Sequence, residues 1–467
     1  MNSKLKDFTY TLSANILNFA IGIVTGFLLP KFLSIDDYAA IKVFTFYIGY
    51  VGFMHLGFID GILLRYGSYD YNELPKKKFR AYFKFLLLFQ VIIMAVMMGV
   101  ISMTTIDPSR RTIFNFVAIN MLIMNLTTFF CFIHQFTKEF KLFSFNLILT
   151  KLFYVIGCLL LFYVHNFAHG AYIILQTGVN LIILLIYIYF DKDLVFGKSE
   201  SIRDNIKDIK ENINIGFFVM IGNFMNIIII GIDRLFIDNL FTKEDFAMYS
   251  FAYSIVSLFY IVLNSLNTVM YPYLTRTPKE RLKDIYGDIK TSVSIIIGAS
   301  LSGFFVIKFI VIRFLSNYVD SLGILIFLIP TVLLSAQISV LISNFYKVLK
   351  LTKEYTKNNI IAFSLGVITN TIAYFTFKST LSIAAASLIS FMIWVLYSDG
   401  FFMKKLRIKV YRSILLEVFI IALFLFTSYF MNWYIGLMTY LICFGVFVFV
   451  FYKKDVMSFI TIIKPRK

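Results

Sequence analysis

Charged side chains are scarce in this chain, making up 15% of its 467 residues. A soluble protein carries about a quarter charged residues, because polar groups must cover its surface. Together with 59% hydrophobic residues and a mean hydropathy of +0.81, this scarcity excludes a soluble globular protein. Cysteine is also rare. Cys131, Cys158 and Cys443 lie in apolar runs without metal-ligand spacing, so they predict no metal site and are interpreted as small buried hydrophobes.

Apolar runs of about twenty residues recur along the whole chain, and each could cross roughly 30 Å of hydrocarbon as a helix. They lack the in-and-out alternation of a barrel strand, which leaves helices as the spanning element. We therefore predict an all-α polytopic membrane protein with about fourteen transmembrane helices. The expected spans lie near 9–31, 38–62, 81–102, 112–134, 142–164, 168–190, 213–240, 246–270, 289–313, 321–346, 358–378, 381–402, 413–431 and 434–452.

Basic residues predict the orientation of these spans. With the N-terminus inside, 34 of the 44 lysines and arginines fall in cytoplasmic segments, 6 in outward loops and 4 within spans. This asymmetry is a positive-inside signal, and it places both termini on the cytoplasmic side of a bacterial inner membrane. The net charge of +18 then lies along the face that meets anionic lipid head groups. Nucleic-acid binding is disfavoured, because the basic runs are short and each adjoins a helix end.

Two short motifs occur twice. SIDDYA at 34–39 recurs as TKEDFA at 242–247, and QFTKEF at 135–140 recurs as KLTKEY at 350–355. The first pair places a hydroxyl residue three positions before an Asp at the start of an apolar run, which is typical of a capping box. The repeats predict two six-helix lobes, in the same orientation because six is even. The expected parts are an N-terminal lobe at 1–190, a cytoplasmic linker at 191–212, a C-terminal lobe at 213–402, and two further helices with a cytoplasmic tail at 403–467.

Three longer stretches carry a family resemblance. LGFIDGILLRYG stands at 56–67, and GIDRLFIDNLFTKEDFAMYSFAYSI at 231–255 is followed by LNTVMYPYLTR at 266–276. They resemble the polysaccharide flippases of the multidrug/oligosaccharidyl-lipid/polysaccharide exporter superfamily, in particular the O-antigen and capsule (Wzx) type. The motifs concentrate in these stretches, and they do not by themselves name the cargo.

The resemblance implies a transport function rather than an enzymatic one. Such a flippase moves an undecaprenyl-pyrophosphate-linked oligosaccharide across the cytoplasmic membrane by alternating access, for O-antigen, capsule or exopolysaccharide assembly. Its partners would be that glycan, membrane lipids, a polysaccharide polymerase and glycosyltransferases. No cofactor is expected. GKS at 197–199 lacks the rest of a phosphate-binding loop, so any uphill work would use an H+ or Na+ gradient or consumption of the flipped product.

Basic residues inside the spans are candidates for binding the substrate. Each charge costs about 2.5–3.5 kcal/mol at the bilayer centre, so it needs a partner or a polar cavity. We predict that Lys151 and Arg234 contact the pyrophosphate. Lys42, near the outer mouth, and Arg65, near the inner mouth, are further candidates, because an anion with alternating access meets both mouths. Snorkelling, or pairing of Lys151 with an acid of another helix, is the alternative interpretation.

Acidic residues inside the spans are candidates for coupling transport to an ion. Asp60 and Asp233 have the depth and helical face to bind a proton or sodium ion. Lys42 and Asp60 are eighteen residues apart and would share a face of one continuous helix, whereas His55 would point away and is assigned no role. A polar stripe within a 140° arc of the seventh span is predicted to line the cavity between the lobes, unless it forms a network between helices. It comprises Asn223, Asn226, Asp233, Arg234 and Asp238.

Other functions stay open. A lipid II flippase and a multidrug or cation antiporter of the same superfamily are alternatives, although basic residues in the spans favour an anionic substrate. A membrane polysaccharide polymerase or acyltransferase is disfavoured, because the outward loops are short and no His–acid pair is placed for acyl transfer.

Overall fold

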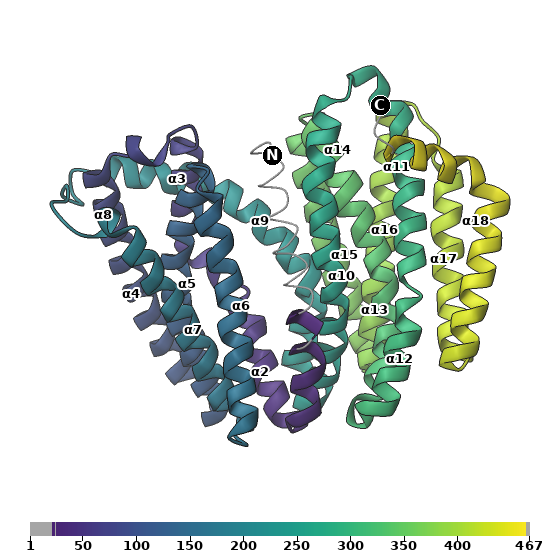
Figure 1. The fold of residues 1–467 in the computed structure, drawn as a ribbon, viewed down its shortest axis with the longest axis horizontal. Coiled ribbons are helices and arrows are strands. Elements are labelled where there is room, and N and C mark those ends of the chain that lie inside the picture. The colour runs from purple at the N-terminus through teal and green to yellow at the C-terminus, as the bar shows by residue number, and fades with distance from the viewer. Residues whose placement is uncertain (1–20, 24, 464–467) are drawn as a thin grey trace. The chain divides into compact units, whose positions relative to one another are not determined.

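A computed structural model describes residues 21–23 and 25–463, apart from the side chains at 140, 226, 262, 264–265, 268–269, 272, 279 and 454–463. Over these residues the chain is all helical, without a strand (Figure 1). It forms two compact units, Met1–Ile228 and Ile229–Lys467. Each unit is described by itself below, and the expected domain boundaries stay predictions.

The first unit contains the helices before the unit boundary. They are α2 Ile35–Ile48, η1 Val51–His55, α3 Phe58–Tyr66, η2 Tyr71–Glu73, α4 Lys76–Thr104, α5 Pro108–Phe136, α6 Phe140–Tyr163, α7 His169–Phe190, α8 Lys192–Val195 and the first part of α9 Ile206–Leu240. Aromatic side chains fill its core where α3, α4, α5 and α7 meet. Phe58, Tyr82, Phe129 and Tyr187 are all buried there.

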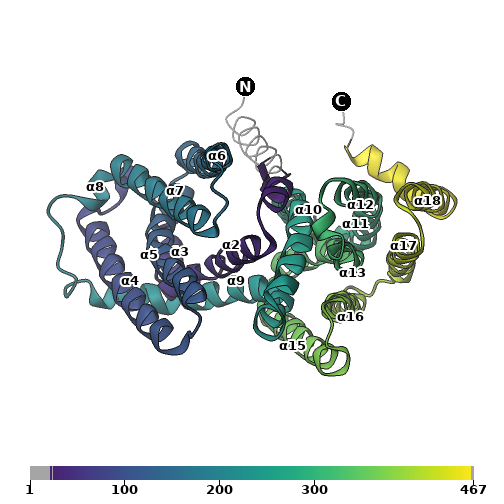
Figure 2. The same ribbon diagram turned by 90° about the horizontal axis from the view of Figure 1, so that it is seen from below.

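The second unit contains the rest of α9 and the helices after it. They are α10 Lys243–Arg276, α11 Lys279–Ser300, α12 Gly303–Phe314, η3 Ser316–Tyr318, α13 Ser321–Ala336, η4 Gln337–Ile342, α14 Ser343–Val348, α15 Thr352–Phe377, α16 Thr380–Leu406, α17 Tyr411–Phe430 and α18 Trp433–Ile463. The central element is α13, whose side chains are almost all buried and which packs against α10, α11, α16 and α17 (Figure 2). It continues into η4, a π-helical turn.

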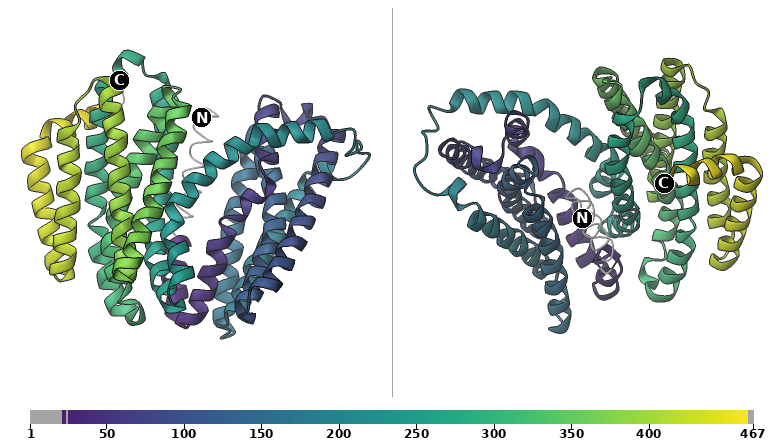
Figure 3. Two further views of the ribbon diagram at one scale, coloured as in Figure 1. Left: turned by 180° about the vertical axis from the view of Figure 1, so that it is seen from behind. Right: turned by 45° about the horizontal axis from the view of Figure 1, so that its top comes forward.

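The last two long helices, α17 and α18, pack side by side at one edge of the second unit, and Figure 3 shows this yellow pair from behind. Lys308 of α12 donates hydrogen bonds of 2.9 Å to the carbonyls of Ser428 and Met431 at the end of α17. These carbonyls have no partner within their own helix, so a lysine there acts as a C-terminal cap.

Ten of the described helices are long and apolar enough to span a membrane, or twelve if each of two bent pairs counts as one span. The all-α membrane fold is therefore confirmed, whereas the count of fourteen is not. The expected span 246–270 coincides with α10, which is not among the twelve. Most of the expected span 9–31 lies outside the described residues. The shorter apolar helix Ile21–Phe32 covers its end.

The repeated capping motif is confirmed at both positions. The Thr242 hydroxyl accepts a hydrogen bond from the amide of Asp245, whose carboxylate accepts one from the amide of Thr242, and α10 begins at the next residue. At the other copy, Ser34 accepts a hydrogen bond from the amide of Asp37 and caps α2. In each case the side chains satisfy amide donors that the first turn leaves without a helical partner.

The second span is broken, which corrects the expectation of one continuous helix over 38–62. The segment Ile35–His55 and α3 meet at a bend of 59°. Leu56 and Gly57 adopt φ values of 51° and 79° there, and glycine enters this left-handed region without steric cost. Gly57 also has no room for a side chain, since a Cβ atom would collide with the backbone of Phe217 in α9.

Candidate functional site

Asp233 is the centre of a buried polar cluster in the second unit. Its carboxylate accepts a 2.7 Å hydrogen bond from the Tyr249 hydroxyl of α10 and a 3.3 Å bond from the Ser387 hydroxyl of α16. The backbone amide of Arg234 donates to the other oxygen at 2.7 Å. A buried carboxylate is tolerated when such donors replace its water, so Asp233 joins three helices of this unit around one acidic group.

The side chain of Arg234 leaves this cluster along α10. Its guanidinium lies 3.6 Å from the centre of the Tyr253 ring, a cation–π geometry, and the side chain is half-buried. Because a guanidinium is planar, it can stack on a ring and still present N–H donors at its edge. Arg234 and Asp233 are therefore neighbours in sequence but contact different residues of α10.

The bend in the second span corrects two predictions about helical faces. The shared face of Lys42 and Asp60 assumed one unbroken helix, but the first lies in α2 and the second in α3, beyond the bend. His55 does not point away from Asp60. Its Nε2 atom lies 3.7 Å from Oδ2 of Asp60, and both side chains are buried. The left-handed residues between them turn the chain, so a rotation of 100° per residue does not apply there.

Arg65 is engaged within the first unit. Its guanidinium lies 3.0 Å from the Asp208 carboxylate and 3.3 Å from that of Glu211, and it donates a 3.0 Å hydrogen bond to the Asn212 side chain. These three residues belong to the first turns of α9, so Arg65 attaches α3 to α9. A pyrophosphate would have to compete with two carboxylates for this side chain.

The other predicted basic residues differ in their surroundings. Lys151 is exposed on α6, and no described residue lies within hydrogen-bonding or ion-pair distance of its ammonium. The half-buried Lys42 has its ammonium 5.0 Å from the centre of the Tyr38 ring. Contact of either residue with a pyrophosphate stays a prediction.

The predicted polar stripe of the seventh span is divided between the two units. Asn223 belongs to the first unit and is exposed, whereas Asp233, Arg234 and Asp238 belong to the second. Asp238 is buried. The side chain of Asn226 lies outside the described residues. That these residues line a cavity stays a prediction.

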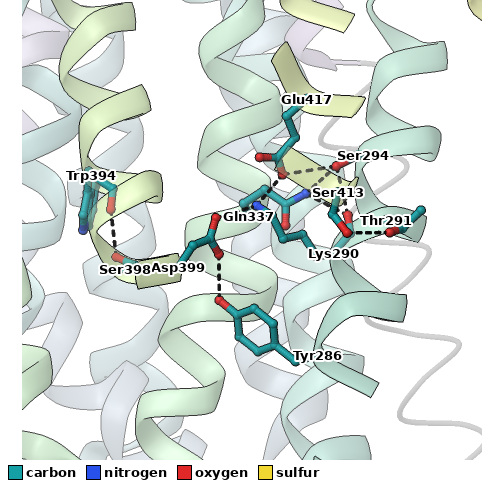
Figure 4. Close-up of polar contacts among 10 residues, drawn as sticks. All are labelled: Tyr286, Lys290, Thr291, Ser294, Gln337, Trp394, Ser398, Asp399, Ser413 and Glu417. Atoms are coloured by element: carbon teal, nitrogen blue, oxygen red, sulfur yellow. Dashed lines mark hydrogen bonds and ion pairs between the residues drawn. The ribbon is translucent and has the colours of Figure 1, made fainter. Parts of the chain in front are cut away.

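A second buried cluster was missed from the sequence, where Lys290 was among the basic residues assigned to cytoplasmic segments. In the structure Lys290 lies within α11 and is 0% exposed. Its ammonium lies 2.6 Å from Oε1 of Glu417 on α17 and 2.9 Å from Oδ2 of Asp399 on α16 (Figure 4). Both acids fall inside expected spans, and acids inside spans are the signal that could have identified this cluster.

Polar side chains surround this cluster. Tyr286 donates a 3.0 Å hydrogen bond to Oδ1 of Asp399, and the Ser294 hydroxyl lies 3.2 Å from Oε1 of Glu417. Gln337, the first residue of the π-helical turn, donates to the Lys290 carbonyl at 3.0 Å and to the Ser294 hydroxyl at 2.9 Å. Four separate elements thus contribute to one network (Figure 4). Turns of π-helix occur frequently at functional sites.

The fold is similar to those of solved transport proteins. The lipid II flippase MurJ in an inward closed conformation has a TM-score of 0.70 at 14% identity, covering 97% of this chain and 100% of that chain. An inward-facing multidrug resistance MATE family transporter of the MOP superfamily has a TM-score of 0.62 at 13% identity, covering 86% of this chain and 98% of that chain. At these identities the likeness concerns the fold.

Sequence comparison identifies the family. No curated protein matches the chain in sequence. Residues 4–278, more than half of the chain, match the profile of the polysaccharide biosynthesis protein family. This range includes all three stretches, at 56–67, 231–255 and 266–276. The resemblance noted from these motifs is therefore confirmed. The chain belongs to the polysaccharide biosynthesis protein family.

Proposed function

We propose that this chain is a flippase that moves an undecaprenyl-pyrophosphate-linked oligosaccharide repeat unit across the bacterial inner membrane by alternating access. One observation carries the proposal: a chain of the polysaccharide biosynthesis family has a fold similar to that of a lipid II flippase over 97% of its length. The match to the multidrug transporter extends over 86%. The family supports a glycan cargo, and the fold supports transport of the lipid-linked form.

Cations in the membrane-spanning helices support an anionic head group. Lys151 is exposed in the middle of α6, and Arg234 stacks on Tyr253 in the second unit. A pyrophosphate carries two or more negative charges, and both side chains would offset the hydration that it loses in a low-dielectric site. Arg65 and Lys42 are weaker candidates for this contact, Arg65 because two carboxylates already hold it.

Coupling to an ion gradient is proposed at Asp233 and Asp60. Asp233 is surrounded by neutral hydroxyl donors, and Asp60 is buried beside His55. A buried carboxylate can bind a proton or a sodium ion, because either one removes the cost of its uncompensated charge. Binding at one of these acids would then accompany the return of the empty flippase.

Lipid II is the second candidate substrate, because the flippase with a TM-score of 0.70 is described as a lipid II flippase. The purified protein in liposomes, supplied with fluorescent lipid-linked substrates, separates the two. Faster flipping of an undecaprenyl-pyrophosphate oligosaccharide than of lipid II supports our proposal. Preference for lipid II reverses the assignment, and movement of neither contradicts both. In cells, loss of the gene should remove surface glycan made by the associated glycosyltransferases and polymerase while lipid-linked precursor accumulates.

A further inference from the structure

The cluster around Lys290 contains one more acid than base. Lys290, Asp399 and Glu417 are 0%, 0% and 3% exposed, and they come from α11, α16 and α17. If both acids were ionised, the cluster would carry one uncompensated negative charge inside a membrane-embedded unit. Such a charge costs several kcal/mol unless a cation or a proton balances it.

The charged and titratable groups facing the two acids are few. From α11 they are Lys290 and Tyr286. Tyr346 of α14 is more distant, since the Phe402 ring contacts both tyrosine rings. The π-helical turn contributes the neutral Gln337. Among the described residues no second cation reaches the cluster, so Lys290 can neutralise only one of its acids.

The contacts of their oxygens distinguish the two acids. Oδ1 of Asp399 accepts a 3.0 Å hydrogen bond from Tyr286, whereas its Oδ2 makes a 2.9 Å ion pair with the Lys290 ammonium that lacks hydrogen-bond geometry. At Glu417 both neighbouring donors, Lys290 and Ser294, approach the same oxygen, Oε1. In the part of the chain that the structure describes, no group donates to Oε2 of Glu417. A proton can therefore occupy Oε2 of Glu417 without displacing a donor, whereas a proton on Oδ2 of Asp399 would lie against the Lys290 ammonium.

We propose that Oε2 of Glu417 is a proton-binding site, with Lys290 and Asp399 forming the ion pair beside it. With the proton bound, the cluster is neutral. When the proton leaves, one negative charge stays buried where α17 packs against α11, and it weakens this packing. The site is separate from the acids proposed for ion coupling, and it does not depend on the identity of the transported lipid.

Infrared spectroscopy of the purified full-length protein tests this site directly. Spectra of the wild type in mildly acidic buffer, minus those of Glu417→Gln, should contain the C=O stretching band of a protonated carboxyl group. The band should shift in D2O and disappear in alkaline buffer. The matched control Asp320→Asn removes an exposed acid of the same unit, so its spectrum should keep the band. A wild-type spectrum without this difference band would overturn the proposal.

A second variant covers the case in which Glu417→Gln does not fold. In Asp399→Asn, Glu417 becomes the only counter-ion of Lys290, so it should ionise and the band should again be lost. A band that persists in Asp399→Asn would contradict the charge balance. A band that persists in Glu417→Gln but is lost in Asp399→Asn would move the proton to Asp399 and refute our assignment.

Thermal stability gives an independent measurement. The melting temperature of the wild type and of Asp320→Asn should fall as the pH rises, because deprotonation leaves a buried charge, whereas Glu417→Gln should lose this part of the pH dependence. Added sodium ions should change none of these differences, since Lys290 repels a second cation. A sodium-dependent shift that Glu417→Gln abolishes would show a metal-ion site instead and contradict the proposal.

Discussion

The hydroxyl of Tyr249 lies 2.7 Å from Oδ2 of Asp233, inside the second unit. Asn at position 233 keeps the size of the side chain but removes its charge. We therefore expect Asp233→Asn, and likewise Asp60→Asn, to abolish ion-dependent flipping in liposomes with an imposed ion gradient, at unchanged protein levels. Asp320→Asn, which removes an exposed acid, is the control. Unchanged ion dependence in both Asp233→Asn and Asp60→Asn would remove these acids from the coupling step.

The same hydrogen bond should contribute to stability. Tyr249→Phe should lower the free energy of unfolding by about 1–3 kcal/mol, because it removes a buried donor.

The charge of Lys151 should matter more than its shape. Lys151→Arg should keep partial export of glycan, whereas Lys151→Gln should stop export and let lipid-linked precursor accumulate, because it removes the charge that would contact the pyrophosphate. Arg234→Lys should be tolerated less well, since lysine lacks the planar group that stacks on Tyr253. Lys353→Gln neutralises an exposed lysine and should export normally. Wild-type export by neutral variants at both positions would make these residues structural.

The predicted orientation can be tested by labelling single cysteines in a cysteine-free background. Cysteines at Ser199 and Lys279 should react with an impermeant thiol reagent only when it is supplied from the cytoplasm. A cysteine at Lys243, in the first turn of α10, should react only from outside. Labelling of Lys243→Cys from the cytoplasm would invert the orientation.

Glycine contacts hold α3 against α9. A Cβ atom at Gly61 would collide with the backbone of Asn212, and one at Gly216 with the carbonyl of Gly57. We expect Gly61→Ala and Gly216→Ala each to lower the free energy of unfolding by about 1–3 kcal/mol, because backbone must move. At Gly99 in α4 an added Cβ meets nothing within 4 Å. Gly99→Ala should therefore be neutral or stabilising by up to about 1 kcal/mol. Equal melting temperatures for all three variants in detergent would contradict this close contact.

Asp193, which follows α7, should make stability depend on pH. Its burial alone would raise its pKa, but Lys76 and Tyr71 outweigh this effect through hydrogen bonds and hold the pKa below the usual value. The contribution of Asp193 to the free energy of unfolding is thus present above the unfolded pKa of about 3.9. It is lost as the pH falls through the folded pKa. Because the side chains of Lys76 and Asp193 are about a third exposed, solvent screens this ion pair, and we expect it to stabilise the fold by at most about 1 kcal/mol.

Unfolding of the wild type and Asp193→Asn should be compared across this range. The advantage of the wild type should be present at neutral pH and disappear in acid. Asp204→Asn, which removes an exposed acid of the same unit, should show no such difference. An advantage that grows on acidification would contradict the assigned ion pair.

Local signals predicted the membrane fold and the helix starts. Apolar runs marked the spanning helices because hydrocarbon leaves the backbone no partner outside its own helix. The hydroxyl and Asp of 242–247 marked the start of α10 because a capping box involves only residues three positions apart. The stretches at 56–67 and 231–255 were sufficient to indicate the family that the profile match then confirmed.

The tertiary structure decided which charged residues meet. Lys290 and Glu417 are 127 positions apart in sequence, and no spacing rule connects them. His55 and Asp60 were separated by a prediction that assumed a straight helix, but the left-handed residues Leu56 and Gly57 bring them within 3.7 Å. Periodicity describes one regular helix, whereas breaks and packing between helices depend on contacts distant in sequence. The sequence by itself therefore determined the fold class and family, and only the packed helices decided which buried charges balance one another.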